Sequence, residues 1–163
     1  MENALQNGGF DQLDRAILKE LQANGRISVA DLARKIHLSA PAVHNRIKRL
    51  EKAGIITGYV ALLDREAAGY DLLCFIQVTI QPHTREHFAC WQEAAERLPQ
   101  ILACYHMASG YDLLLKVAVK NNKALDRFIA EHLMTLPGVE RIETGMVLNE
   151  LKTTTALKVT SDD

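Results

Sequence analysis

The sequence contains few residues that could build a metal centre or a redox site. Its 163 residues include three cysteines, Cys74, Cys90 and Cys104, and no two of them form a CxxC pair. Zinc clusters and thioredoxin-like redox sites rely on such pairs, so neither is predicted. His83 and His87 have the i, i+4 spacing of helical metal ligands. Because no third ligand is near them in the sequence, we expect solvated histidines and no bound metal.

Long apolar runs and the short motifs of common enzymes are also missing. No apolar stretch approaches the roughly 20 residues that span a bilayer, and residues 1–10 lack a signal-peptide core. The sequence has no P-loop and no GxGxxG motif, and no arrangement of serine, histidine and acid has motif support for nucleophilic catalysis. We therefore expect a cytoplasmic protein with no membrane partner, no enzymatic activity and no cofactor.

The sequence has no overall excess of positive charge, but its basic residues are concentrated in one stretch. The formal net charge is -1, which by itself gives no indication of a nucleic-acid partner. Residues 34–52, however, hold six basic residues against Glu51 alone; these six, the basic island, are Arg34, Lys35, Arg46, Lys48, Arg49 and Lys52. A local basic stretch on a neutral or acidic chain is typical of a nucleic-acid-binding surface.

Hydrophobic periodicity and capping residues predict three short helices in the first third of the chain. Ser28 and Ser39 are good N-caps for the second and third of them. The expected ends are Asn24-Gly25 for the first helix, Ile36 for the second and Ala53-Gly54 for the third. Residues 55–62 are rich in β-forming residues and predict the strands of a wing. Two helices joined by a tight turn, with a packing helix before them and strands after them, indicate a winged helix-turn-helix.

The third helix is the predicted DNA-reading element. Its buried stripe, Val43, Ile47 and Leu50, fixes which face turns outward, and the major groove is about 12 Å wide and admits one helix. The residues expected to contact DNA are Ser39, Ala40, Pro41, His44, Asn45, Lys48 and Arg49, with Arg34 from the second helix.

Chemistry assigns different roles to these side chains. Asn45 can pair bidentately with an adenine edge, and His44 can donate to or accept from a base. The free N–H groups at Ser39 suit a phosphate, and the basic residues add affinity that depends on salt but not on sequence. The alternative is that the charges form a solvated helix face. Arg46 is ambiguous, because it could instead tie the helix to its neighbours.

The second half of the chain has a different hydrophobic pattern, in which strands alternate with helices. The expected strands cover 72–80, 101–107, 112–119 and 139–148, and the expected helices cover 85–98 and 122–136. This βαββαβ order is that of a ferredoxin-like α/β sandwich, so the whole chain is predicted to be α+β. Residues 1–63 form the predicted DNA-binding domain, 64–69 a linker and 70–163 the second domain. Residues after Leu151 could add an edge strand.

Several segments, in this order and spacing, resemble the Lrp/AsnC "feast/famine" transcriptional regulators. They are Leu13–Leu18, Asn24–Ser28, Asp31–Ala33, Leu38-Ser39, Val43–Glu51, Gly54–Tyr59, Leu136–Val139, Thr144 and Val147-Leu148. The resemblance covers nearly the whole chain. It implies that the second domain senses amino acids and drives oligomerisation. It also implies that sheets pair between chains in dimers, that dimers assemble further, commonly into octamers, and that small effectors bind at contacts between dimers.

The loop that matches the family's effector loop is Ser109–Asp112. A tight glycine turn that exposes backbone N–H groups beside a carboxylate suits the charged ends of an amino acid. The predicted effector contacts are Ser109, Gly110, Tyr111, Asp112 and the nearby His106. The family usually has two residues between the glycine and the aspartate, whereas this chain has one. The alternatives are a plain β-turn whose Asp112 satisfies nearby amides, and a core or interface role for His106.

These features predict a sequence-specific transcriptional regulator that binds double-stranded DNA. Its assembly or DNA affinity would respond to an amino acid or related metabolite, which needs only that the effector bind one assembly better than another. The alternative is an architectural protein that bridges DNA with little effector control.

Overall fold

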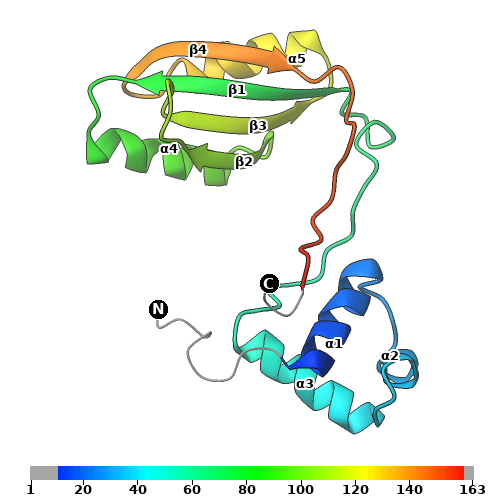
Figure 1. The fold of residues 1–163 in the computed structure, drawn as a ribbon. Coiled ribbons are helices and arrows are strands. Elements are labelled where there is room, and N and C mark those ends of the chain that lie inside the picture. Colours follow the sequence, from blue (N-terminus) through cyan, green and yellow to red (C-terminus); the bar gives the residue numbers. More distant parts are fainter. Residues whose placement is uncertain (1–10, 160–163) are drawn as a thin grey trace. The chain divides into compact units, whose positions relative to one another are not determined.

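The computed structural model describes residues 11–159, which divide into two compact units (Figure 1). The first unit runs to Leu62 and takes in the chain again from Thr153, and the second comprises Leu63–Lys152. Each unit has its own apolar core. No helix within residues 11–159 is long and apolar enough to cross a membrane.

Three helices form the first unit, and side-chain caps explain where each begins. They are α1 (Gln12–Ala23), α2 (Val29–Lys35) and α3 (Ala40–Lys52). Asp11 caps α1 in a capping box with Asp14, whose backbone N–H donates to the Asp11 carboxylate at 2.8 Å. Ser28 and Ser39 accept hydrogen bonds from backbone N–H groups in the first turns of α2 and α3. The helix-turn-helix predicted from the sequence is therefore confirmed.

The core of the first unit is built from one face of each helix. Its buried members are Ile17, Leu18, Leu32, Ala33, Val43 and Leu50. Ile17, Leu32 and Val43, one from each helix, are completely buried. Burying an aliphatic side chain contributes about 1.5–3 kcal/mol. This cluster therefore fixes which face of α3 turns outward.

The prediction that residues 55–62 form the strands of a wing is wrong. These residues form no strand, and Val60 and Leu62 are largely exposed. A strand needs a hydrogen-bonded neighbour, and no segment within the described chain pairs with this one as a strand.

The chain from Thr153, assigned from the sequence to the second domain as a possible edge strand, lies with the first unit instead. Leu157 exchanges two hydrogen bonds with the Gln22 side chain, at 2.6 and 3.0 Å. Val159 packs against the helical core. The Gln22 amide supplies both a donor and an acceptor, so it satisfies this backbone without a strand ladder.

Residues 64–69, predicted as a linker, form a hydrogen-bonded turn that belongs to the second unit. The Asp64 carboxylate accepts a hydrogen bond from the Ala67 N–H at 2.8 Å, and Gly69 closes the turn with a φ of 84°. An aspartate that caps its own turn and a glycine at positive φ are typical turn chemistry.

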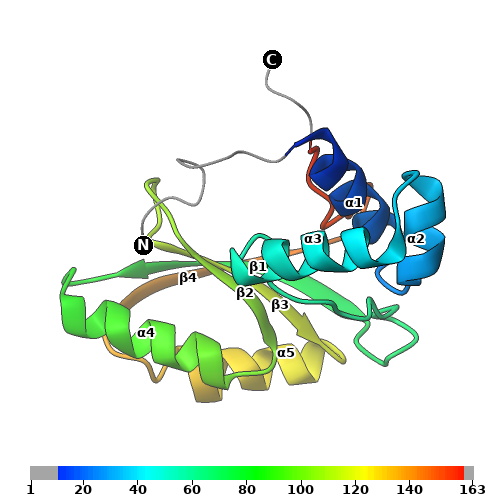
Figure 2. The same cartoon turned by 90° about the horizontal axis from the view of Figure 1, so that it is seen from below.

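An antiparallel four-stranded sheet with helices on one face forms the second unit (Figures 1 and 2). The strands are β1 (Leu72–Ile80), β2 (Ile101–His106), β3 (Leu113–Val119) and β4 (Val139–Met146). The helices are α4 (Arg85–Arg97) and α5 (Asn122–Phe128), and α5 continues into the π-helical turn η1 (Ile129–Leu133). The sheet order is β2-β3-β1-β4. This βαββαβ arrangement confirms the predicted ferredoxin-like α+β fold.

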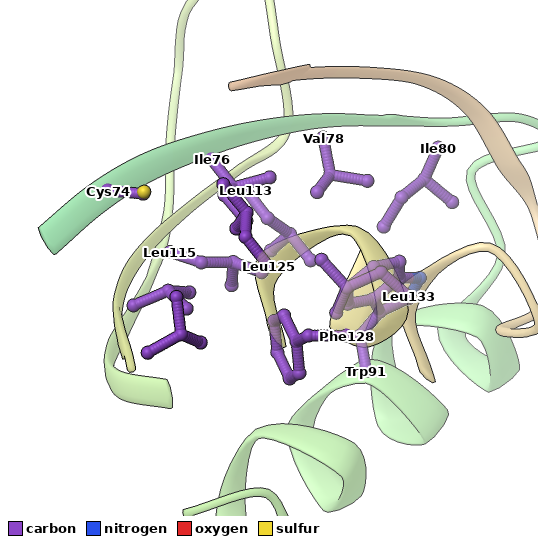
Figure 3. Close-up of a cluster of buried hydrophobic side chains, with 12 residues drawn as sticks. Cys74, Ile76, Val78, Ile80, Trp91, Leu113, Leu115, Leu125, Phe128 and Leu133 are labelled. Carbon is purple, nitrogen blue, oxygen red and sulfur yellow. The ribbon is translucent and has the colours of Figure 1, made fainter. Parts of the chain in front are cut away.

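The core of the second unit lies between the sheet and its helices (Figure 3). Ile76, Val78 and Ile80 alternate along β1 and are completely buried. They meet Trp91 of α4 and Phe128 at the end of α5. Because strand side chains alternate between faces, the residues between them belong to the opposite face of the sheet.

Candidate nucleic-acid interface and effector loop

The outer face of α3 holds the side chains predicted to contact DNA. Val43 and Leu50 are buried, whereas the predicted contact residues are all exposed; these are Ser39, Ala40, Pro41, His44, Asn45, Lys48 and Arg49. Within residues 11–159, the side chains of His44, Asn45 and Lys48 make no hydrogen bond or ion pair. An unpaired donor or acceptor on an outward helix face is available to a partner.

The two arginines of α3 differ from Lys48, because both pair with the buried Asp14. Arg46 donates to Asp14 at 2.8 Å and to Asp11 at 2.6 Å, and Arg49 donates to the other oxygen of Asp14. These hydrogen bonds to Asp11 and Asp14 raise the pKa of Arg46 above its ordinary value. Burial acts to raise the pKa of Asp11, but hydrogen bonds from the Asp14 N–H and Arg46 outweigh it, so that pKa is lowered. The interpretation of Arg46 as a tie to neighbouring elements agrees with this geometry.

From the sequence alone, Asp14 is a candidate cap or dipole partner at the start of the first helix. The spacing of Asp14 from the apolar residues of this helix also indicates that it is buried. Residue 14 lies three and four residues before Ile17 and Leu18, so it falls on the buried face of the helix. A carboxylate on a buried face needs a partner, and the basic island supplies two.

The two basic residues of the basic island that lie on α2 also pair with carboxylates. Arg34, a predicted DNA contact, pairs with Asp31 of its own helix, and Lys35 pairs with Glu20 at 2.6 Å. All four side chains are at least partly exposed, and exposed ion pairs contribute at most about 1 kcal/mol. Either cation can therefore exchange its partner for another anion at little cost.

The predicted effector loop joins β2 to β3. Ser109 Oγ donates to the Tyr111 carbonyl at 3.1 Å, and Gly110 has open space where a Cβ would stand. The N–H groups of Gly110 and Tyr111 donate to no acceptor within residues 11–159. Ser109, Gly110 and Tyr111 therefore leave two N–H donors available on a turn.

Asp112 differs from the rest of the loop because both of its carboxylate oxygens are engaged. One accepts the Ile80 N–H at 2.8 Å, and the other lies 2.9 Å from His83 Nε2. The aspartate thus ties the loop to the end of β1. This agrees with the alternative that Asp112 satisfies nearby amides in a plain β-turn. His83, expected from the sequence to be a solvated histidine, therefore has a carboxylate partner.

A pocket of about 480 Å³ opens beside the base of this loop, between α4 and β2. His106 and Leu113, the last residue of β2 and the first of β3, form one end of it. The His106 ring lies 4.6 Å from that of Phe88, centroid to centroid. The rest of the lining is mostly apolar, with Trp91 on the helix side. Its polar lining residues are Gln92, Glu96 and His106, and a mostly apolar pocket with a few polar groups suits a small molecule that has one apolar end.

The two histidines considered as metal ligands have other contacts. His87 Nδ1 lies 2.9 Å from the Pro82 carbonyl oxygen, and the same ring packs against Gly138. Within residues 11–159, no group of three or more histidine, cysteine, aspartate or glutamate side chains is placed to hold a metal ion.

Fold and geometry together define a class: a helix-turn-helix protein whose third helix turns a polar face outward, joined in one chain to a ferredoxin-like domain with a glycine turn and a pocket beside it. Comparison with known families gives the same two parts. Residues 10–57 match a winged helix-turn-helix DNA-binding family, and residues 73–157 match the Lrp/AsnC ligand binding domain.

Relatives and solved structures match over almost the full length. The leucine-responsive regulatory proteins of Klebsiella pneumoniae and Escherichia coli K12 are each 35% identical over 150 residues, which is 92% of this chain and 92% of theirs. A transcriptional regulator from Neisseria meningitidis, solved as a complex with L-Met, superposes with a TM-score of 0.87 at 32% identity, covering 91% of this chain and 96% of that one. Escherichia coli AsnC superposes with a TM-score of 0.82 at 28% identity over 90% and 97%.

The chain belongs to the Lrp/AsnC family of transcriptional regulators. It is a DNA-binding transcriptional regulator whose second domain is of the family's amino-acid-binding type. The members of this family are transcriptional regulators and not enzymes. The resemblance stated from the sequence is thereby confirmed. The roles of individual residues stay predictions.

Proposed function

We propose that the protein reads specific DNA sequences with the outer face of α3. The unpaired side chains of His44, Asn45 and Lys48 on that face carry the proposal. Asn45 and His44 read base edges, and Lys48 and the helix start at Ser39, with Ala40 and Pro41 beside it, contact phosphates. Arg34 and Arg49 join the interface only by leaving their carboxylate partners.

Selection of bound duplexes from a random DNA pool, followed by affinity measurements over a range of salt, tests this proposal. Asn45→Ala should lose about 1–3 kcal/mol of discrimination between the selected site and random DNA. Lys48→Ala should weaken both duplexes alike and flatten the salt slope by roughly 1. Lys123→Ala, an exposed lysine of the second unit, is the matched control and should change neither. Equal loss on both duplexes for Asn45→Ala would remove the base-reading role.

We also propose that a small apolar amino acid is the effector. Its charged ends would meet the free N–H groups of the 109–111 turn and His106, and its side chain would enter the pocket between α4 and β2. Asp112 would hold the turn in place through Ile80 and His83 rather than contact the effector itself. The support for this is that His106 belongs both to the pocket lining and to the base of the loop.

Calorimetric titration with each of the twenty amino acids tests the effector proposal. Ala95 lines the pocket, so Ala95→Phe should abolish the binding of any amino acid that binds the natural protein. Ala95→Ser keeps the space and should bind normally. Unchanged binding by Ala95→Phe would exclude the pocket. No binding by any of the twenty at millimolar levels would favour the architectural, DNA-bridging alternative.

We propose further that copies of the chain assemble through the face of the sheet that the helices leave open. Phe75 and Tyr105 lie on that face and are 37% and 52% exposed. Sedimentation should show a dimer, or a larger assembly of dimers, that Phe75→Arg dissociates. Met134→Arg changes an exposed residue beyond η1 and should leave the assembly intact.

A DNA-binding regulator of this kind would work in the cytoplasm.

A further inference from the structure

Asp14 occupies an unusual position for a carboxylate. It lies in the first turn of α1 and is only 1% exposed. One oxygen accepts from Arg46 at 2.8 Å, and the other accepts from Arg49 and, at 3.2 Å, from the Asp11 N–H. A single buried carboxylate thus holds two guanidinium groups of the reading helix.

We propose that Asp14 is a positioning residue that sets DNA specificity by withholding Arg46 and Arg49 from the phosphate backbone. The inference rests on the proposed function of α3. Phosphate contacts add affinity to every duplex alike, whereas base contacts discriminate between sequences. A reading helix whose arginines are held on the protein gains less from random DNA, so its specificity rests on Asn45 and His44.

The two arginines are held unequally. The Arg49 side chain is 61% exposed and has Asp14 as its only carboxylate partner within residues 11–159. Arg46 is 25% exposed and is also bound to Asp11 at 2.6 Å. Neutralising Asp14 should therefore release Arg49 first, and neutralising Asp11 as well should release both.

Salt titrations of the full-length protein separate this role from a purely structural one. Affinity for a random duplex and for the selected site is measured between 50 and 200 mM salt for the natural protein, Asp14→Asn and Asp14→Asn/Asp11→Asn. Each additional phosphate contact steepens the logarithmic salt slope by about 0.9. One released arginine therefore adds about a threefold loss of affinity over this fourfold salt range. A loss of packing alone would weaken binding without steepening the slope.

The expected result is a steeper slope and a smaller specificity ratio for Asp14→Asn, and a still steeper slope for the double variant. A slope that stays unchanged in folded Asp14→Asn protein overturns the proposal. Should Asp14→Asn fail to fold, Arg49→Gln decides the question in the natural background. An unchanged slope supports withholding, and a slope flatter by about 0.9 shows that Arg49 already contacts phosphate and overturns it.

The same titrations distinguish failure of this inference from failure of the proposed function. A normal flattening by Lys48→Ala with no change in Asp14→Asn rejects the role of Asp14 alone. No effect of either Lys48→Ala or Asn45→Ala rejects α3 as the reading helix.

Discussion

Replacing Gly138 by alanine tests whether steric fit holds the turn that leads into β4. Gly138 has a φ of 76°, and a Cβ at this position would lie 2.4 Å from His87 Nδ1 and 2.9 Å from Ile80 Cγ2. The left-handed conformation costs alanine about 1–2 kcal/mol. Forcing a methyl group into a packed site typically costs a further 1–3 kcal/mol, roughly. We expect Gly138→Ala to lower the free energy of unfolding by about 2–5 kcal/mol.

Two other glycines of the second unit separate the contributions of strain and of steric overlap. Gly69 has a φ of 84° with no atom within 4 Å of its Cβ position, so Gly69→Ala should show the strain alone, about 1–2 kcal/mol. Gly110 has neither feature, and Gly110→Ala should stay within about 0.5 kcal/mol of the natural protein. Trp91 is the only tryptophan and is 1% exposed in the core of this unit, so its fluorescence during urea unfolding reports all three variants.

Equal destabilisation by Gly138→Ala and Gly69→Ala would refute the close approach as a cause. The His87→Ala background gives an independent check, because two of the three nearest atoms to the added methyl group, including the nearest, belong to the His87 ring. In that background the effect of Gly138→Ala should fall toward that of Gly69→Ala. An undiminished effect would mean that the ring already moves aside freely.

Three further predictions concern other parts of the chain. Burial, with the charge and hydrogen bond of Glu51, raises the pKa of Tyr59, so the stability that this tyrosine contributes is present below pH 10 and is lost as pH rises through the raised pKa. Tyr59→Phe should remove that alkaline loss in unfolding measurements at pH 9 to 12, and an unchanged pH profile would contradict it. Ile76→Ala empties a completely buried position and should cost about 2–5 kcal/mol in urea unfolding, whereas a cost below about 1 kcal/mol would contradict the core assignment. Gln22→Ala should expose the Leu157 N–H to hydrogen exchange, and retained protection would show that this contact does not hold the C-terminal segment.

The helices and the order of the strands could be predicted because their signals are local. Ser28 and Ser39 cap the helices that the sequence assigns to them, and alternation along β1 identifies its buried face. Residues 55–62 look equally like a strand. Local preference for extended backbone, however, does not supply a neighbour, and strand formation depends on one. The chain from Thr153 was misplaced for the same reason, since its partner is Gln22, more than a hundred residues away.

The predicted effector loop shows a different limit of sequence reasoning. The turn at Gly110 follows from local composition, but the contacts of Asp112 do not. Its carboxylate is engaged by the Ile80 N–H and by His83, which reach it only because β1 pairs with β3 in this register. The pocket beside His106 likewise depends on how α4 packs on β2, which no spacing in the sequence specifies.

The basic island illustrates why counting charges along a chain overstates the charge that DNA would meet. Four of its six cations pair with carboxylates that lie before it in the sequence: Arg34 with Asp31, Lys35 with Glu20, and Arg46 and Arg49 with Asp14. Within the described chain, Lys48 and Lys52 have no such partner. Because an exposed pair exchanges partners easily and a buried carboxylate does not, the pairs at Asp31 and Glu20 differ in kind from those at Asp14. The α2 cations should be available to DNA and the α3 arginines should not, so substitutions of Arg34 and Arg49 are expected to act on the salt slope in different ways despite their shared place in the sequence pattern.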